Sequence, residues 1–232
     1  MSEEVKGDLT LDDSHMSEYQ RILACHEAGH TVASYLYKRR IKYVTIKPNI
    51  DWEDEDTLDC EGIMMPGRSG DRTGHDVEMC LASKKLRLPF FGGRYGFQAK
   101  ENVKAWIERE CIINLAGYVA EEVVTGNYEN EFLAYQSTEL SARLESEDRL
   151  KVSQFCDAVC FDEVEAKAYF NYLLERTRNI IRLPAHQCAI ETLAAELVAH
   201  RTIGGRRAME IIKAAITQTL LECVSSRETV AA

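Results

Sequence analysis

Five consecutive residues, His26-Glu27-Ala28-Gly29-His30, have the types and the spacing of a catalytic metal site. Residues four apart on a helix share one face, so His26 and His30 can offer both imidazoles to a single ion. Glu27 lies next to the first histidine and can take a proton from a water molecule held by that ion. The pattern therefore predicts a bound Zn2+ and a zinc metallopeptidase in which Glu27 is the general base.

A catalytic zinc site usually has three protein ligands, and the residues alone leave the third one open. The other histidines, at 15, 75, 186 and 200, have no context that marks them as a ligand, so a carboxylate is the better candidate. Two of the acidic candidates, Glu121 and Glu122, could instead orient a histidine or lie on a helix surface. The full set of candidates is Glu121, Glu122, Glu147 and Asp148.

Helices and two short strands are expected to position these residues. The metal motif lies inside a predicted helix from Ser17 to about Lys38, with Ser17 and Gln20 as a capping box. Residues 41–48 alternate like a strand, and residues 61–66 predict a second strand whose Pro66 favours an edge position. Further helices are predicted at 103–124, 147–160, 163–182, 186–200 and 205–222.

This order of elements predicts a mainly helical α+β fold, with a small β-sheet that includes an edge strand. We expect one domain over residues 17–222, between a disordered acidic tail at 1–16 and a C-terminal tail at 223–232. An extended peptide could add to the edge strand at Gly62, Ile63 and Met64 through main-chain hydrogen bonds. These three residues are the predicted substrate-binding positions, and an edge strand without a binding role is the alternative.

Composition excludes several other classes of protein. The chain has 232 residues, 45% of them hydrophobic, which suffices for one sizeable core. A formal net charge of −10 argues against nucleic acid and anionic membranes as partners. The absence of a long apolar run and of a secretory signal predicts a soluble, cytoplasmic protein. The eight cysteines form no Cys-x-x-Cys pair and are expected to be reduced and mostly buried.

Four separated segments, in this order, resemble the zinc protease domain of the FtsH-type, membrane-anchored AAA+ proteases. ILACHEAGHTVASYL resembles the metal-binding helix of that family, and VTIKP followed by EGIMMP is similar to its strand pair. The resemblance thus implies that the edge strand lines the cleft beside the metal-binding helix. INLAGYVAEEVVTG resembles its central helix, and LAAELVAHRTIGGRRAMEIIKAA its final helix pair. The resemblance covers about residues 19–218 and implies the fold and the peptidase activity of that domain.

The resemblance also implies a third zinc ligand. In the family this ligand is an aspartate that opens the helix after the central one, and Asp148 falls at that point of the sequence. Glu147 is its competitor, because the usual lead-in of the family is replaced here by LESE at 144–147. The implied ligand set is His26, His30 and Asp148.

The sequence departs from the family in having neither a membrane anchor nor a Gly-x-x-x-x-Gly-Lys-Ser/Thr phosphate loop. We therefore expect an ATP-independent metalloendopeptidase that acts on unfolded or extended polypeptides, or that depends on a separate unfoldase. The family forms rings with the help of its ATPase module, so a homo-oligomer and a monomer both stay open here. Two alternatives remain: a catalytically inactive binding or adaptor module, and a zinc amidohydrolase for small substrates. The intact Glu27 favours an enzyme, and the edge strand favours an extended substrate.

Overall fold

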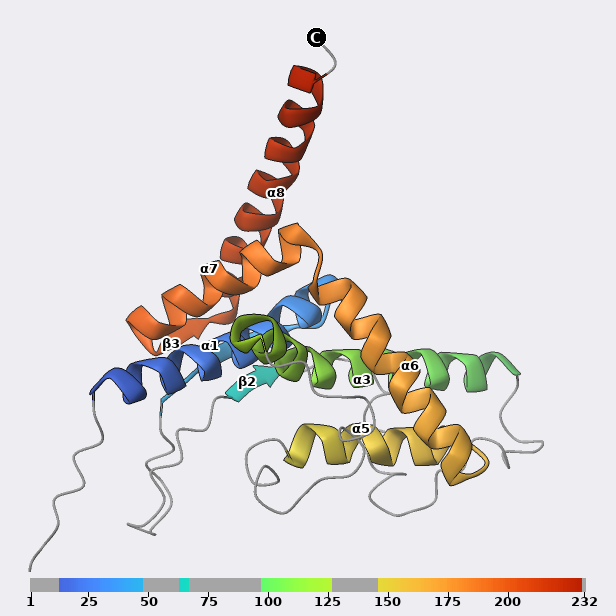
Figure 1. Cartoon of the computed structure of the whole chain (residues 1–232). Coiled ribbons are helices and arrows are strands. Elements are labelled where there is room, and N and C mark those ends of the chain that lie inside the picture. The colour runs from blue at the N-terminus through green and yellow to red at the C-terminus, as the bar shows by residue number, and fades with distance from the viewer. Residues whose placement is uncertain (1–12, 48–62, 67–96, 127–145, 231–232) are drawn as a thin grey trace, which may run out of the picture.

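The computed structural model describes residues 13–47, 63–66, 97–126 and 146–230. These ranges contain six helices and three strands, which confirms a mainly helical fold with a small β-sheet (Figure 1). In chain order they are α1 (Asp13–Leu36), β1 (Ile41–Thr45), β2 (Ile63–Pro66), α3 (Phe97–Thr125), α5 (Ser146–Val159), α6 (Glu163–Ile181), α7 (Pro184–His200), β3 (Thr202–Gly204) and α8 (Gly205–Val230).

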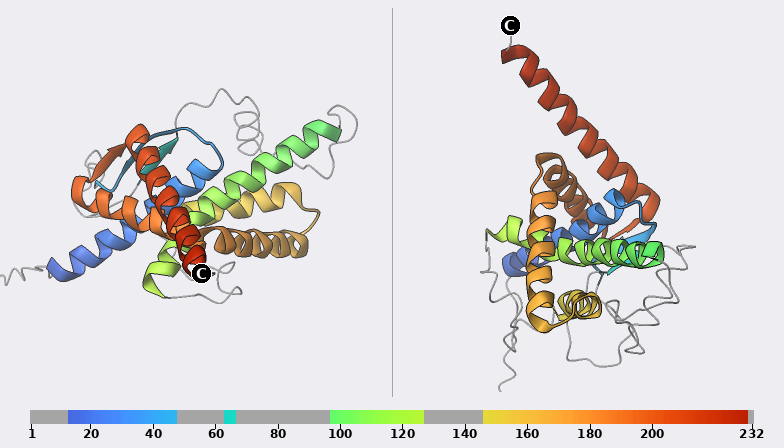
Figure 2. Two further views of the ribbon diagram at one scale, coloured as in Figure 1. Left: turned by 90° about the horizontal axis from the view of Figure 1, so that it is seen from above. Right: turned by 90° about the vertical axis from the view of Figure 1, so that its right-hand side faces the viewer.

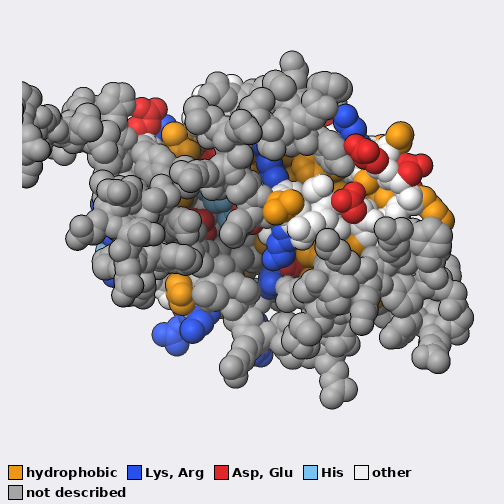
Figure 3. All heavy atoms as spheres, turned by 90° about the horizontal axis from the view of Figure 1, so that it is seen from below, with side chains coloured by type: hydrophobic (Ala, Val, Ile, Leu, Met, Phe, Trp, Pro, Cys, Tyr) orange, Lys and Arg blue, Asp and Glu red, His pale blue; other side chains and the backbone are white. Residues whose placement is uncertain are grey.

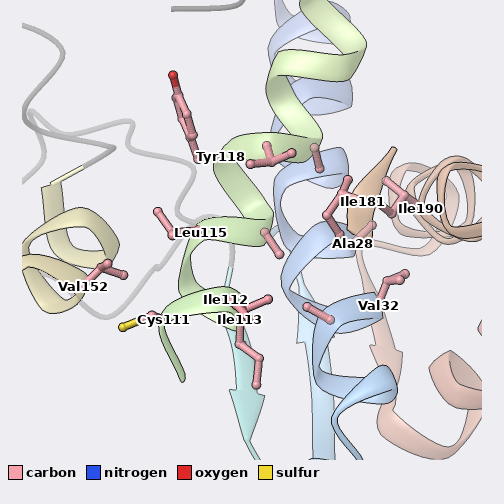
Figure 4. Packing of buried hydrophobic residues seen from close by; sticks show 14 of the residues in the cluster. Ala28, Val32, Cys111, Ile112, Ile113, Leu115, Tyr118, Val152, Ile181 and Ile190 are labelled. Carbon is pink, nitrogen blue, oxygen red and sulfur yellow. The ribbon is translucent and has the colours of Figure 1, made fainter. Parts of the chain in front are cut away.

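Helix α3 lies at the centre of the molecule and packs against α1, α5 and α6. All its residues from 110 to 120 are buried, as expected for a helix that is apolar on several faces. Cys111 and Leu115 lie on the side of α3 that faces Val152 of α5, whereas Ala28 and Val32 of α1 lie on another side (Figure 4). Helix α3 therefore fixes the positions of α1 and α5 relative to each other.

The sheet has three antiparallel strands in the order β2-β1-β3. Val44 of β1 pairs with Met64 of β2 on one side and with Ile203 of β3 on the other. Strand β2 is thus an edge strand, and it contacts α1, the helix with the metal motif. This arrangement confirms the predicted strand pair and the predicted edge strand beside that helix.

The later helices enclose the other side of α1 and α3. Helix α6 begins at the N-cap Asp162, whose carboxylate accepts a hydrogen bond from the backbone N–H of Glu165 (2.8 Å). It is joined to α3 by a buried ion pair, in which Nε of Arg178 donates to Oε2 of Glu122 (2.9 Å). Helix α7 packs on α1, and the first half of α8 packs on α7, whereas the rest of α8 projects from the body (Figure 2).

Helices α1, α3 and α8 and strand β3 differ from the expectations. Helix α3 begins at Phe97, six residues before its predicted start at 103. Helix α1 begins at Asp13, four residues before the predicted start. Strand β3 was not expected, because its three residues are too few to show a periodic pattern. Helix α8 runs on to Val230, through most of the segment expected to be a tail. The sequence did not predict this extension, because a solvated helix shows no apolar stripe.

Two expectations from composition can also be compared with the structure. No helix in the described ranges is long and apolar enough to cross a membrane. Six cysteines lie in these ranges, all of them free thiols, and four are buried: Cys25, Cys111, Cys156 and Cys160. The expected disordered tail at 1–16 falls largely on residues 1–12, outside the described ranges.

Candidate metal centre

The two histidines of the metal motif lie side by side on the face of α1 that packs on α3. The Nε2 atoms of His26 and His30 are 2.8 Å apart, one helical turn from each other. Gly117 of α3 allows this approach, since a Cβ atom there would lie 2.5 Å from Nε2 of His30 and 2.8 Å from Cε1 of His26. Gly29 does the same for the helix backbones, because its Cβ would lie 2.8 Å from Cβ of Ala120. The close approach of α1 and α3 therefore builds the histidine pair into the helix interface.

The other ring nitrogen of each histidine is bound by α3. Nδ1 of His26 lies 2.6 Å from Oε1 of Glu121, and Nδ1 of His30 lies 2.7 Å from the carbonyl oxygen of Ile113. A carboxylate and a carbonyl only accept hydrogen bonds, so both Nδ1 atoms carry a proton. In the neutral imidazoles the two Nε2 atoms therefore hold lone pairs, the arrangement found in metal-ligating histidines.

Asp148, at the start of α5, brings a carboxylate oxygen to the same point. Its Oδ2 lies 3.0 Å from Nε2 of His30 and 3.6 Å from Nε2 of His26. The Asp148 side chain is 37% exposed, compared with 16% for His26 and 9% for His30. Three acceptor atoms thus meet at a site that is buried on the helix side and open on the aspartate side.

Three acceptors at these distances repel one another unless a proton or a metal ion lies between them. Burial alone would lower the pKa of His26, but hydrogen bonds to Asp148 and Glu121 raise it to about 10. Burial would also lower the pKa of His30, but the charge and hydrogen bond of Asp148, together with the charge of Glu27, raise it. Burial alone would raise the pKa of Asp148, yet the two histidines hold it well below its usual range. The site therefore attracts positive charge strongly.

Glu27 lies beside the two histidines, but its environment differs from theirs. Its side chain is only 3% exposed, and its Oε2 has no hydrogen-bond partner among the described residues. Burial raises the pKa of this carboxyl group, against the opposing effect of His30 and His26. Ligand atoms of His26, Glu27 and His30 all lie within 4.8 Å of one another, so this group could hold a metal ion. Histidine and acidic side chains are visible next to each other on one face of the molecule (Figure 3).

The remaining predicted site residues fall in different places. Glu122, one candidate ligand, points away from the histidines and pairs with Arg178. Glu147 lies in α5, but its side chain is outside the described part of the structure. Ile63 and Met64 lie in β2, where they pair with Thr45 and Val44 of β1, and Gly62 lies outside the described residues.

Sequence reasoning missed two contributions to the site. The carbonyl of Ile113 is a backbone group, so no side-chain pattern could have indicated it. Gly117 lies among the small residues of INLAGYVAEE, and that run was the available signal of a close helix contact. Glu121 was a candidate for either a ligand or an orienting residue, and the structure places it on Nδ1 of His26.

Comparisons with known proteins add no assignment to this geometry. No protein-family model matches the chain, and no curated protein matches it.

Proposed function

We propose that this chain is a zinc-dependent metalloendopeptidase that hydrolyses peptide bonds in unfolded or extended polypeptides. The observation that carries the proposal is the convergence of three acceptor atoms beside a buried carboxylate, one oxygen of which has no hydrogen-bond partner among the described residues. The acceptors are Nε2 of His26, Nε2 of His30 and Oδ2 of Asp148, and the carboxylate belongs to Glu27.

The donor set fits zinc in its catalytic form. Two imidazoles and one carboxylate are a known ligand set of catalytic zinc, which keeps a fourth position for water or substrate. The exposed side of Asp148 leaves room for that position. A zinc ion held by these residues would lower the pKa of a water molecule toward neutrality, so that the water could lose a proton and attack a carbonyl carbon, and would stabilise negative charge on the carbonyl oxygen.

Glu27 is the general base in this proposal. Its buried carboxylate has a raised pKa, so it accepts a proton more readily than an exposed glutamate. Its Oε2 makes no hydrogen bond within the described residues and is therefore available to the attacking water. After attack, the same group can pass the proton to the leaving amine.

Glu121 and the carbonyl of Ile113 hold the two imidazoles in place. Each accepts the Nδ1 proton of one histidine and thereby leaves Nε2 of that ring as the nitrogen that can bind a metal ion. The negative charge of Glu121 also makes the imidazole of His26 a stronger donor to a metal ion.

The edge strand β2 supports an extended polypeptide as the substrate. One side of β2 pairs with β1, and the other side pairs with no strand in the described ranges. A peptide added there at Gly62, Ile63 and Met64 would be held by main-chain hydrogen bonds with little selectivity for side chains. Because β2 contacts α1, such a peptide would run close to the motif helix.

The resemblance of four segments to FtsH-type protease domains supports the same reaction and Asp148 as third ligand. We propose that hydrolysis at this site needs no ATP, because the zinc ligands and Glu27 supply the groups that the reaction requires. The family resemblance is the one argument for a homo-oligomer.

The central test combines zinc analysis with a casein-cleavage assay on the purified wild type and Glu27→Gln. We expect about one zinc per chain in both proteins and cleavage only by the wild type, because the variant keeps the ligands and loses the base. The matched control is Glu18→Gln, an exposed glutamate of the same helix, which should cleave at the wild-type rate. Equal activity of Glu27→Gln would refute the mechanism.

The ligand assignment is tested separately with Asp148→Asn. This variant should lose most of its bound zinc, whereas Asp157→Asn, an exposed position on the same helix, should keep it. Normal zinc content in Asp148→Asn would remove Asp148 from the ligand set and favour Glu147.

The same assays separate the alternative functions. Zinc binding with no cleavage of casein or of small amides would indicate an inactive binding or adaptor module. Cleavage of small amides with no cleavage of casein would indicate an amidohydrolase instead.

A further inference from the structure

A contact between an arginine and an aromatic ring joins α3 to the first turn of α5. The guanidinium carbon of Arg149 lies 4.2 Å from the centre of the Tyr118 ring. Tyr118 is 8% exposed and belongs to α3, and Arg149 is half-buried. A cation over an aromatic face at this distance is attracted by the negative charge density of the ring.

Both partners of this contact are next in sequence to residues at the histidine pair. Tyr118 follows Gly117, whose backbone lies directly against the imidazoles of His26 and His30. Arg149 follows Asp148, whose Oδ2 lies 3.0 Å from Nε2 of His30. The contact therefore connects the backbone that supports the histidines to the backbone that carries the aspartate.

The first turn of α5 needs such a connection. Asp148 is the third residue of the helix, and the N–H groups of a first turn have no partner within the helix. The first buried apolar side chain of α5 is Val152, one turn later, and Leu150 between them is 57% exposed. Apolar packing thus fixes α5 only beyond Asp148, and the position of Asp148 depends on the contacts of its neighbours.

We propose that Arg149 and Tyr118 are positioning residues that hold Asp148 at the histidine pair and thereby set the zinc affinity of the site. This inference rests on the proposed function, since it takes Asp148 as the third zinc ligand. It adds a residue pair that is neither among the three proposed ligands nor the proposed general base.

The test measures zinc affinity by competition with a chelator for the wild type, Arg149→Gln, Tyr118→Leu and Tyr118→Phe. Arg149→Gln and Tyr118→Leu remove the contact and should weaken zinc binding about three- to thirty-fold, the range expected from the strength of such contacts. Tyr118→Phe keeps the ring and should bind zinc like the wild type. The matched control is Lys151→Gln, which removes a positive charge from α5, the helix of Arg149. Lys151 lies near Glu110 of α3, and this variant should also bind zinc normally.

A second measurement shows whether the two residues act through each other. The double variant, Arg149→Gln with Tyr118→Leu, should bind zinc as tightly as whichever single variant has the lower zinc affinity. Either change alone already removes the contact, so the second change has nothing further to remove. Losses that multiply would overturn the proposal, since each residue would then act independently. Excess zinc should restore casein cleavage in Arg149→Gln, which a role in substrate binding or catalysis would not allow.

Thermal unfolding of the metal-free proteins separates positioning from folding. Arg149→Gln should unfold at the wild-type temperature without zinc and gain less stability when zinc is added. Because Arg149 is only half-buried, this variant keeps the test valid if Tyr118→Leu is unstable. Wild-type zinc affinity in Arg149→Gln would overturn this inference alone, whereas a wild type that binds no zinc would refute the proposed function as well.

Discussion

Two glutamates that are neighbours in the sequence of α3 have different partners. Glu121 accepts a hydrogen bond from Nδ1 of His26, and Glu122 forms a buried ion pair with Arg178 of α6. Successive residues of a helix point in directions about 100° apart, so one faces α1 and the other faces α6. At the scale of single residues, a change at Glu121 should therefore affect the metal site, and a change at Glu122 the fold.

We expect Glu121→Gln to bind zinc about ten- to a hundred-fold more weakly than the wild type, because a neutral amide is a poorer acceptor for the Nδ1 proton of His26. Zinc affinity measured against a chelator tests this. Glu210→Gln, at an exposed position of α8, is the control and should bind zinc normally. Unchanged affinity in Glu121→Gln would show that His26 does not need this acceptor.

Helices α1 and α3 approach each other closely at Gly29 and Gly117. Without a side chain at either position, the imidazoles of His26 and His30 can lie against the backbone of α3. At the scale of elements, the site is thus a product of how two helices pack. A methyl group in this contact has no free space to occupy.

Gly117→Ala should displace the two imidazoles, since the new Cβ would lie 2.5 Å from Nε2 of His30. We expect loss of zinc binding together with a destabilisation of about 1–3 kcal/mol from overpacking. Zinc analysis and thermal unfolding measure the two effects. Gly204→Ala, where nothing lies within 4 Å of the added Cβ, should change neither of them. Full zinc content in Gly117→Ala would mean that the helices can separate without cost to the site.

At the scale of the whole molecule, α8 divides into a packed part and a projecting part (Figure 2). Ile212 and Ala215 are buried, and Ile216 still packs on the core. Farther along the helix, Leu220 and Leu221 are 55% and 62% exposed. The body of the protein therefore gains little stability from the end of α8.

A chain that ends after Gln218 should keep its unfolding temperature and its zinc content, because none of the removed residues whose side chains are described is buried. A chain that ends after Met209 loses the buried Ile211 and Ile212 and should be clearly destabilised. Thermal unfolding of both proteins tests this. A large loss of stability in the longer chain would show that the projecting part is packed in solution.

The sequence predicted most helices, the strand pair and the His26-Glu27-His30 group, because periodic patterns and a fixed spacing are local properties. Strand β3 could not be predicted, since its pairing with β1 joins segments far apart in the chain. The roles of Glu121 and Glu122 could not be separated either, because they depend on which helix packs on which face of α3. Asp148 was singled out only through a family resemblance.

The side chains at the histidine pair come from helices that begin at Asp13, Phe97 and Ser146. During synthesis from the N-terminus, the metal motif leaves the ribosome long before α3 and α5 do. A partly made chain thus carries His26 and His30 without the acceptors that fix their ring protons, and without Asp148. The order of synthesis therefore delays assembly of the candidate metal centre until α3 and the start of α5 have also emerged.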